Sequence, residues 1–270
     1  MLDVSRYRVP PGTRVALTEF DPDAKTGFEG GKDVGKKALL SLNDRLSELQ
    51  RRLWAEANQS LLLVIQAIDT GGKDSTIRKV FTGVNPQGVR VSSFGVPTET
   101  DLAHDYLWRV HKETPPDGYI KVFNRSHYED VLVARVKELV PEETWSRRYR
   151  HIREFERMLR EEGTRIVKVF LHISKDEQKE RLRDRLDEPD KNWKFSKADL
   201  ADRALWEAYQ RAFEDALNET STEYAPWYVV PANRKWYRNL VVSTILIETL
   251  EDMDPRYPEP EEGLEDVEVT

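Results

Sequence analysis

The sequence predicts an α/β protein of three layers, in which helices cover both faces of a parallel sheet of about five strands. Two observations lead to this fold class. Short apolar runs alternate along the chain with longer stretches of helical periodicity. The run at 61–68 is apolar almost throughout, as in strands that are buried on both faces. Strands that alternate with helices in this way form parallel sheets with helical crossovers.

The other elements follow from their periodicity and from their end signals. A leucine stripe at 39–53 predicts a helix that leads into the central strand. Further strands are expected at 88–94, 119–123, 165–173 and 227–230. Further helices are expected at 102–110, 128–139, 145–162, 174–186, 196–218 and 240–250, the last of them amphipathic. Gly163 stands at a C-cap position, Ser174 at an N-cap, and residues 196–199 have the form of a capping box.

Composition limits the class of protein and its surroundings. With 39% hydrophobic and 34% charged residues, the 270-residue chain is expected to be soluble and globular. A formal charge of −7 argues against a nucleic-acid partner, so any anion site must be a local basic pocket. The absence of cysteine excludes disulfides and thiolate metal sites. No signal peptide or long apolar stretch is visible, so we expect a cytoplasmic protein without a membrane partner.

A glycine turn follows the central strand and predicts a phosphate-binding loop. Gly72 and Lys73 fit the pattern G-x-x-x-x-G-K-[ST], whereas Ala67 replaces its first glycine and Asp74 its hydroxyl. The alternative is an ordinary glycine-rich turn between a strand and a helix. Residues 30–33 repeat the tetrapeptide Gly-Gly-Lys-Asp without a preceding strand, and we expect that copy to be a solvated loop. The preceding strand therefore marks residues 71–74, and not residues 30–33, as the predicted phosphate-binding loop.

The expected binding edge is the one where the parallel strands end. The carboxyl ends of all strands share one edge of such a sheet, and ligands bind there. Asp69, Asn124, Arg125 and residues 233–234 are expected to converge on this edge. The predicted phosphate ligands of the loop are Thr70, Gly71, Gly72, Lys73, Asp74 and Ser75.

Three charged side chains at this edge carry the predicted chemistry. Lys73 adds a point charge beside the loop amides, and Arg125 can hold a second phosphate with two hydrogen bonds. Asp69 is the expected ligand of Mg²⁺, which prefers carboxylate and phosphate oxygens. The alternative for Asp69 is a role in capping the turn.

Cations cluster a second time at 175–203. Acidic residues are interleaved with them, so the alternative for most of them is a solvated helix face with ion pairs. Four of them flank a break between two predicted helices, where nucleotide kinases carry a closing lid. We therefore assign phosphate binding to these four, which are Arg181, Arg185, Lys191 and Lys194.

His127 lies close to the predicted site and has two interpretations. It can be a phosphorylated nucleophile, or a hydrogen-bonded structural residue at a strand-to-helix turn. Glu129 and Asp130 are the nearby acids. The sequence favours the structural role and direct transfer between two bound substrates.

Four motifs in order closely resemble the second polyphosphate kinase family. They are Ala-Ile-Asp-Thr-Gly-Gly-Lys-Asp at 67–74, Val-Phe-Asn-Arg-Ser-His-Tyr-Glu-Asp at 122–130, Asp-Glu-Pro-Asp-Lys-Asn-Trp-Lys-Phe-Ser at 187–196 and Ala-Pro-Trp-Tyr-Val-Val-Pro-Ala-Asn-Arg-Lys-Trp at 225–236. The resemblance covers about residues 20–252. It implies a P-loop kinase fold with a helical lid, which moves phosphoryl groups between inorganic polyphosphate and nucleotides. Mg²⁺ is the implied cofactor, and Mn²⁺ is the alternative.

The resemblance also implies roles for single residues. Asp69 and Lys73 match the family's Walker A acid and lysine, and Asn124-Arg125 matches its Walker B position, which is Asp-Arg in many members. The asparagine resembles class III, whose members phosphorylate nucleoside mono- and diphosphates. The missing carboxylate is expected to be replaced by Glu129 or Asp130, so we place Asn124, Glu129 and Asp130 on the nucleotide side.

The domain organisation and the function are then predicted together. Residues 1–59 form an N-terminal extension and a helix that packs on the core, and residues 60–252 form the kinase domain, with its lid at about 175–206. The acidic tail at 253–270 is expected to be disordered. Asp69, Lys73 and Arg125 are assigned to in-line transfer from polyphosphate to AMP and ADP, with ATP as an end product. The alternatives are an ATP-dependent nucleoside monophosphate kinase and a non-catalytic binding protein. Family resemblance implies a homo-oligomer, either a dimer or a tetramer.

Overall fold

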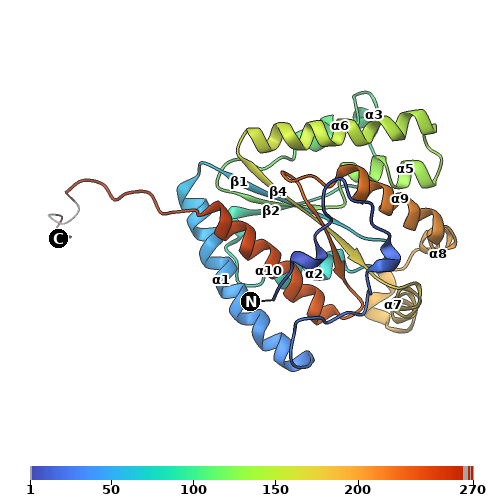
Figure 1. The fold of residues 1–270 in the computed structure, drawn as a ribbon, viewed down its shortest axis with the longest axis horizontal. Helices are drawn as coiled ribbons and strands as arrows, with labels where there is room; N and C mark the ends of the chain where they lie inside the picture. The colour runs from blue at the N-terminus through green and yellow to red at the C-terminus, as the bar shows by residue number, and fades with distance from the viewer. Residues whose placement is uncertain (1, 264–266, 268, 270) are drawn as a thin grey trace.

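A parallel sheet of five strands organises the chain. The computed structural model describes residues 2–263, 267 and 269. The strands are paired in the order β2-β3-β1-β4-β5, and every pair is parallel (Figure 1). They are β1 Ser60–Gln66, β2 Val89–Ser93, β3 Ile120–Asn124, β4 Thr164–His172 and β5 Trp227–Pro231. This sheet confirms the predicted fold class and all five predicted strands.

Helices cover both faces of the sheet and one of its ends (Figure 1). One face carries α1 Lys32–Glu56, α2 Lys73–Val80 and α10 Lys235–Met253. The other carries α5 Val133–Val136, α6 Glu142–Glu161 and α9 Trp206–Thr220, with the short helices α3 Glu99–Leu102 and α4 Trp108–His111 in the connection after β2. At the end lie α7 Lys175–Asp187 and α8 Lys197–Ala204. The short 3₁₀ turns are η1 Ser5–Tyr7, η2 Leu17–Glu19, η3 Pro86–Gly88, η4 His127–Asp130 and η5 Pro189–Lys194.

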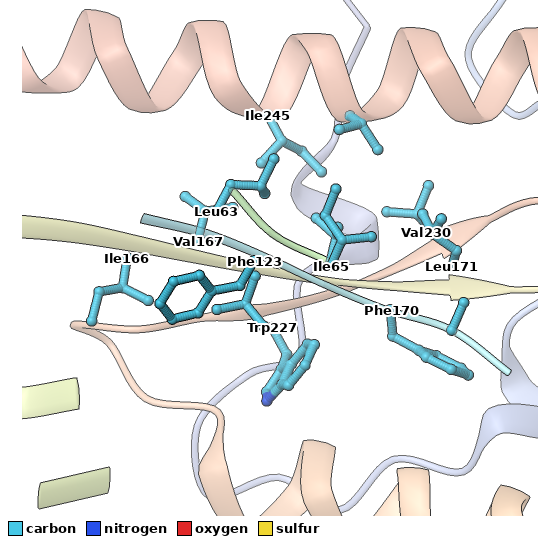
Figure 2. Packing of buried hydrophobic residues seen from close by; sticks show 14 of the residues in the cluster. Leu63, Ile65, Phe123, Ile166, Val167, Phe170, Leu171, Trp227, Val230 and Ile245 are labelled. Carbon is cyan, nitrogen blue, oxygen red and sulfur yellow. The ribbon is translucent and has the colours of Figure 1, made fainter. Parts of the chain in front are cut away.

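The core lies above and below the sheet. Every residue of β1 is buried, as the apolar run predicts. Figure 2 shows Ile245 of α10 on one side of the strands, with Phe123, Phe170 and Trp227 on the other. The prediction that the last helix is amphipathic is wrong, because α10 lies between the sheet and α1 and is buried on nearly all sides.

The N-terminal segment covers one edge of the sheet. The backbone N–H of Val9 donates to the Trp227 carbonyl over 2.8 Å, and Arg8 forms an antiparallel bridge with Tyr228. The hydroxyls of Tyr7 and Tyr237 lie 2.7 Å apart. Strand β5 is therefore not left as an open edge, which would be a site of unwanted strand pairing.

Several predicted boundaries differ from the structure. The helix predicted at 102–110 is divided into α3 and α4, because the Asp105 carboxylate accepts from the backbone N–H of Leu107 and forms a turn. The helix predicted at 128–139 is reduced to η4 and α5, and the one at 196–218 breaks at Leu205. The copy at 30–33 is exposed, but Lys32 and Asp33 already belong to α1.

Two further expectations concern the ends of the chain and the membrane. The chain runs on without helix or strand after α10, up to residue 263. Residues 264–266, 268 and 270 of the predicted disordered tail lie outside the described residues. Within the described part of the chain, no helix is both long and apolar enough to cross a membrane.

Candidate active site

The loop between β1 and α2 has the shape of a phosphate-binding turn. Gly72 is the N-cap of α2 and has a φ of 96°, which glycine adopts without strain. A Cβ on Gly71 would lie 2.4 Å from the Cβ of Ala67, so the turn requires glycine there as well. The Lys73 ammonium donates to the Ala67 carbonyl over 3.1 Å and is thereby held at the mouth of the loop. The backbone N–H groups at this helix start favour a bound anion.

The end of β3 places Asn124 and Arg125 beside the loop. Asn124 is in register with Ile65 of β1, and the backbone N–H of Arg125 donates to the Ile65 carbonyl. The Asn124 amide donates to the Asp74 carboxylate over 2.7 Å. Arg125 has a φ of 61°, and its guanidinium donates to the Asp69 carboxylate over 2.7 Å. The convergence of Asp69, Asn124 and Arg125 is therefore present.

Burial shifts the pKa of several groups at this site. Burial, and then the charge of Arg125, lowers the pKa of the Lys73 ammonium. Burial raises the pKa of Glu129, although Arg125 and Lys73 act in the opposite direction. Burial also raises the pKa of Asp130, which pairs with Arg148 at 3.1 Å. The site thus combines several cations with carboxylates that accept protons more readily than usual.

A cavity of about 770 Å³ opens over the phosphate loop. Its lining combines the loop, the ends of β2 and β3, and cations from α2, α7, η5 and α10. The cationic members are Lys73, Arg78, Arg125, Arg181, Arg185, Lys191, Lys194, Lys235 and Arg238. Such a row of cations in an acidic protein is the local basic pocket that the composition requires.

A second cavity of about 330 Å³ joins the first. Both cavities are lined by Asp69, Phe94, Gly95 and Arg125. The second is more apolar, with a wall formed by residues of the segments after β1 and after β2, of α5 and of α9. Glu129 and Asp130 line the second cavity but not the first, whereas Asn124 lines the first but not the second.

The four predicted cations of 175–206 all line the larger cavity, but their environments differ. Arg181 is buried and donates to the Thr70 carbonyl over 3.0 Å, as well as to the carbonyls of Ala232 and Asn233. It therefore holds the phosphate loop against the β5–α10 turn. Direct contact between Arg181 and phosphate stays a prediction.

The other three cations lie nearer the surface. Arg185 pairs with Asp199 at 3.0 Å and donates a hydrogen bond to the Lys194 carbonyl. Lys191 pairs with Glu188. The ammonium of Lys194 lies 4.9 Å from the centre of the Trp193 ring. Their contact with phosphate also stays a prediction.

Sequence reasoning missed three cations of the larger cavity. Arg78 comes from α2, and Lys235 and Arg238 come from the first turn of α10. The sequence signal was the cluster of cations directly after the last strand, where residues 233–234 were expected to face the ligand. Instead Asn233 accepts from the Ser174 backbone, and Arg234 pairs with Asp23.

His127 is completely buried and lines neither cavity. Its ring lies 3.3 Å from the Glu156 carboxylate, which also accepts from Lys168 and from the Tyr128 hydroxyl. All four side chains are inaccessible to solvent. The structure therefore agrees with the structural role for His127.

The donors at the site fit a divalent cation that also binds phosphate. Among residues 2–263, 267 and 269, no group of three or more His, Asp or Glu side chains is close enough to hold a metal ion. Mg²⁺ typically uses one or two carboxylates and takes its other ligands from water and substrate phosphates. Asp69, which lines both cavities, can supply such a carboxylate.

A parallel α/β fold with a glycine loop and a cationic cavity at the strand ends defines a phosphate-binding protein of the nucleotide-kinase type. A sequence profile of the family described as polyphosphate kinase 2 matches residues 29–258. The chain belongs to this polyphosphate kinase 2 family.

Individual proteins resemble the chain over almost its whole length. An AMP/ADP-polyphosphate phosphotransferase of Meiothermus ruber is 61% identical over 98% of this chain and 99% of its own. An ADP-polyphosphate phosphotransferase of Rhodopseudomonas palustris is 45% identical over 96% and 93%. The crystal structure of polyphosphate kinase 2 from Arthrobacter aurescens TC1 superposes with a TM-score of 0.95, at 43% identity, and covers 98% of this chain and 95% of that one.

Proposed function

We propose that this chain transfers the terminal phosphoryl group of inorganic polyphosphate to AMP and ADP, in a reversible reaction. Membership of the polyphosphate kinase 2 family and the names of two close relatives support this activity. The structural observation that carries it is the meeting of two unlike cavities at Asp69 and Arg125. One cavity suits a chain of phosphates, and the other suits a partly apolar nucleotide.

Polyphosphate is assigned to the larger cavity. Its cations come from α2, α7, η5 and α10 and from Arg125 at the end of β3, so they can neutralise several successive phosphate groups. The segment at 175–206, which contains α7, η5 and α8, forms one wall of this cavity and is assigned as a lid. Closure of such a segment over polyphosphate would exclude water from the transferred group.

The nucleotide is assigned to the smaller cavity. Its apolar wall offers a surface for a base, as in most small-molecule sites. Glu129 and Asp130 lie on the same side and can position the sugar or the metal-bound phosphate. Asn124 and its partner Asp74 line only the larger cavity, so this assignment of the cavities puts Asn124 on the polyphosphate side and does not support its predicted place beside the nucleotide.

A divalent cation, for which we propose Mg²⁺ with Mn²⁺ as the alternative, would be held by Asp69 together with phosphate oxygens. It would supply positive charge to the oxygens of the transferred group. Lys73 and Arg125 supply further charge from the protein, in positions that the loop and the end of β3 fix in advance.

The transfer is an in-line displacement. A terminal phosphate oxygen of AMP or ADP forms a bond to the end phosphorus of polyphosphate, and the bridging P–O bond to the next phosphate breaks. Polyphosphate leaves one unit shorter with the negative charge on its new terminal oxygen. The attacking oxygen is already ionised at neutral pH, so no strong general base is required. His127, buried away from both cavities, is not needed as a covalent carrier.

One incubation separates this function from its two alternatives. AMP, polyphosphate and Mg²⁺ are mixed with the protein without ATP, and the nucleotides are separated by chromatography. The proposal expects ADP and then ATP. An ATP-dependent monophosphate kinase would give no product until ATP is added, and a binding protein would give none at all. The homo-oligomer and the cytoplasmic location stay predictions.

A further inference from the structure

Arg238 is a buried arginine beside the phosphate loop. It lies in the first turn of α10 and lines the larger cavity, yet its side chain is only 1% exposed. Its guanidinium donates to the Ser75 hydroxyl over 3.1 Å and to the Asn239 amide oxygen over 2.9 Å. Both acceptors are uncharged, and the charged side chain that acts most strongly on Arg238 is another cation, Arg181.

One nitrogen of this guanidinium has no hydrogen-bond partner. Among the described residues, nothing accepts from Nη1 of Arg238. This nitrogen lies next to Gly72, and a Cβ on that glycine would come within 2.1 Å of it. Buried charges in proteins are normally paired, because desolvation without compensation is costly. Burial and the repulsion from Arg181 accordingly lower the pKa of Arg238 to about 9, although Glu177 acts in the opposite direction, and Arg238 is still cationic at neutral pH.

The contacts of Arg238 connect its charge to the loop. The Ser75 hydroxyl that accepts from Arg238 itself donates to the Gly72 carbonyl over 2.9 Å. The guanidinium therefore supports the turn at Gly72 and Ser75, and this turn lines the same cavity. A phosphate bound at the turn would lie close enough to compensate the Arg238 charge, in surroundings of low dielectric constant.

We propose that Arg238 is a positioning residue for polyphosphate: it holds the Gly72–Ser75 turn, and its counter-ion is the phosphate group that binds at that turn. The inference rests on the proposed function, because it takes polyphosphate as the occupant of the larger cavity. In the ligand-free protein the buried charge has no counter-ion, so Arg238 should lower the free energy of unfolding or leave it unchanged. In the complex the charge is compensated, so Arg238 should increase the affinity for polyphosphate.

The test compares wild type with Arg238→Met, which keeps the volume and removes the charge. Tripolyphosphate with Mg²⁺, in the absence of nucleotide, serves as the probe in calorimetric titration and in thermal unfolding. We expect tripolyphosphate to bind the variant about 10- to 100-fold more weakly, the loss expected when a cation near a bound anion is removed in surroundings of intermediate dielectric constant. We expect the ligand-free Tm to stay unchanged or to rise, because an apolar side chain of similar volume often replaces a buried charge without loss.

Two further measurements distinguish positioning from a merely structural role. The KM for polyphosphate should rise while the KM for AMP stays unchanged, because Arg238 lines only the larger cavity. Arg238→Lys, which keeps the charge, should recover part of the lost affinity. Arg165→Met serves as the matched control, since Arg165 pairs with Asp252 and lines neither cavity. This control should bind tripolyphosphate as wild type does.

Three outcomes would overturn the inference. They are an Arg238→Met protein that binds tripolyphosphate like wild type, one that unfolds at a lower temperature than wild type without ligand, and an Arg238→Lys protein no better than the methionine variant. Failure of the wild type to bind tripolyphosphate would instead contradict the proposed function.

Discussion

The guanidinium of Arg125 and the carboxylate of Asp69 lie 2.7 Å apart at the junction of the two cavities. In this arrangement neither residue is free for its predicted ligand: Arg125 covers the carboxylate that would bind the metal, and Asp69 neutralises the guanidinium that would bind phosphate. Metal and phosphate would therefore bind together. The Asp69–Arg125 ion pair would then be replaced by two, Asp69 with the metal and Arg125 with phosphate.

This exchange predicts that Arg125 competes with the metal. Arg125→Ala should bind Mg²⁺ several-fold more tightly than wild type when no phosphate is present, because the Asp69 carboxylate is released. Calorimetric titration of Mg²⁺ into both proteins measures the effect. Arg165→Ala, which removes a cation paired with Asp252 outside both cavities, should leave Mg²⁺ binding unchanged. Weaker Mg²⁺ binding by Arg125→Ala would show that Arg125 does not compete for Asp69.

Lys73 is expected to act on charge that develops during the transfer. Lys73→Ala should lower kcat by about 10²–10³, the typical cost of removing one preorganised donor. Asp69→Asn should show a similar loss, with only partial rescue by extra Mg²⁺. Circular dichroism should show that both variants stay folded. Lys79→Ala, on the exposed part of α2, is the control and should keep wild-type activity. A rate within a few-fold of wild type for Lys73→Ala would remove this lysine from the mechanism.

The lid is tested most clearly at Lys194. Arg185 and Lys191 are held by carboxylates, so charge reversal there also breaks an ion pair, whereas the ammonium of Lys194 lies over the Trp193 ring. Lys194→Glu should raise the KM for polyphosphate, and added salt should raise the wild-type KM as well, because the contacts are ionic. Arg183→Glu, on the exposed face of α7 outside both cavities, should leave the KM unchanged. Equal KM values for Lys194→Glu and wild type would show that Lys194 does not bind polyphosphate and belongs to a solvated helix face.

His172 predicts a step in stability below neutral pH. Burial lowers its pKa from 6.5 to about 4, although the Phe20 backbone and Asp21 act in the opposite direction. Between these values the unfolded chain binds the proton and the folded chain does not, so the free energy of unfolding falls as the pH falls. The loss approaches about 3 kcal/mol by pH 4. Thermal unfolding between pH 4 and 7 should show this step in wild type and in His104→Gln, an exposed control, but not in His172→Gln. An unchanged step in His172→Gln would assign it to other groups.

The local sequence signals were strong enough to predict the part of the site that is formed by the loop after β1 and by the end of β3. The apolar run of β1, the glycine turn and the polar residues at the end of β3 each carry their signal within a few residues. Parallel pairing then brings Asp69, Lys73 and Arg125 together, because all strands end at one edge. The same reasoning could not find the Asp69–Arg125 pair, whose geometry depends on the positive φ of Arg125.

The contribution of α10 could not be predicted for a different reason. Its hydrophobic pattern starts at Leu240, so the predicted helix omitted the turn that carries Lys235 and Arg238. Arg238 reaches Ser75 across more than half of the chain, and no local pattern reports such a contact. Arg181 was recognised as a cation of the site, but its bonds to backbone carbonyls became visible only in three dimensions.

The central claim is that polyphosphate and nucleotide occupy adjoining cavities together and exchange the phosphoryl group directly. Initial rates measured over a grid of AMP and polyphosphate concentrations test it most directly. The account predicts double-reciprocal lines that intersect, as for a ternary complex, and a His127→Ala protein that keeps substantial activity. Parallel lines, together with a phosphorylated protein that then converts AMP to ADP, would contradict it.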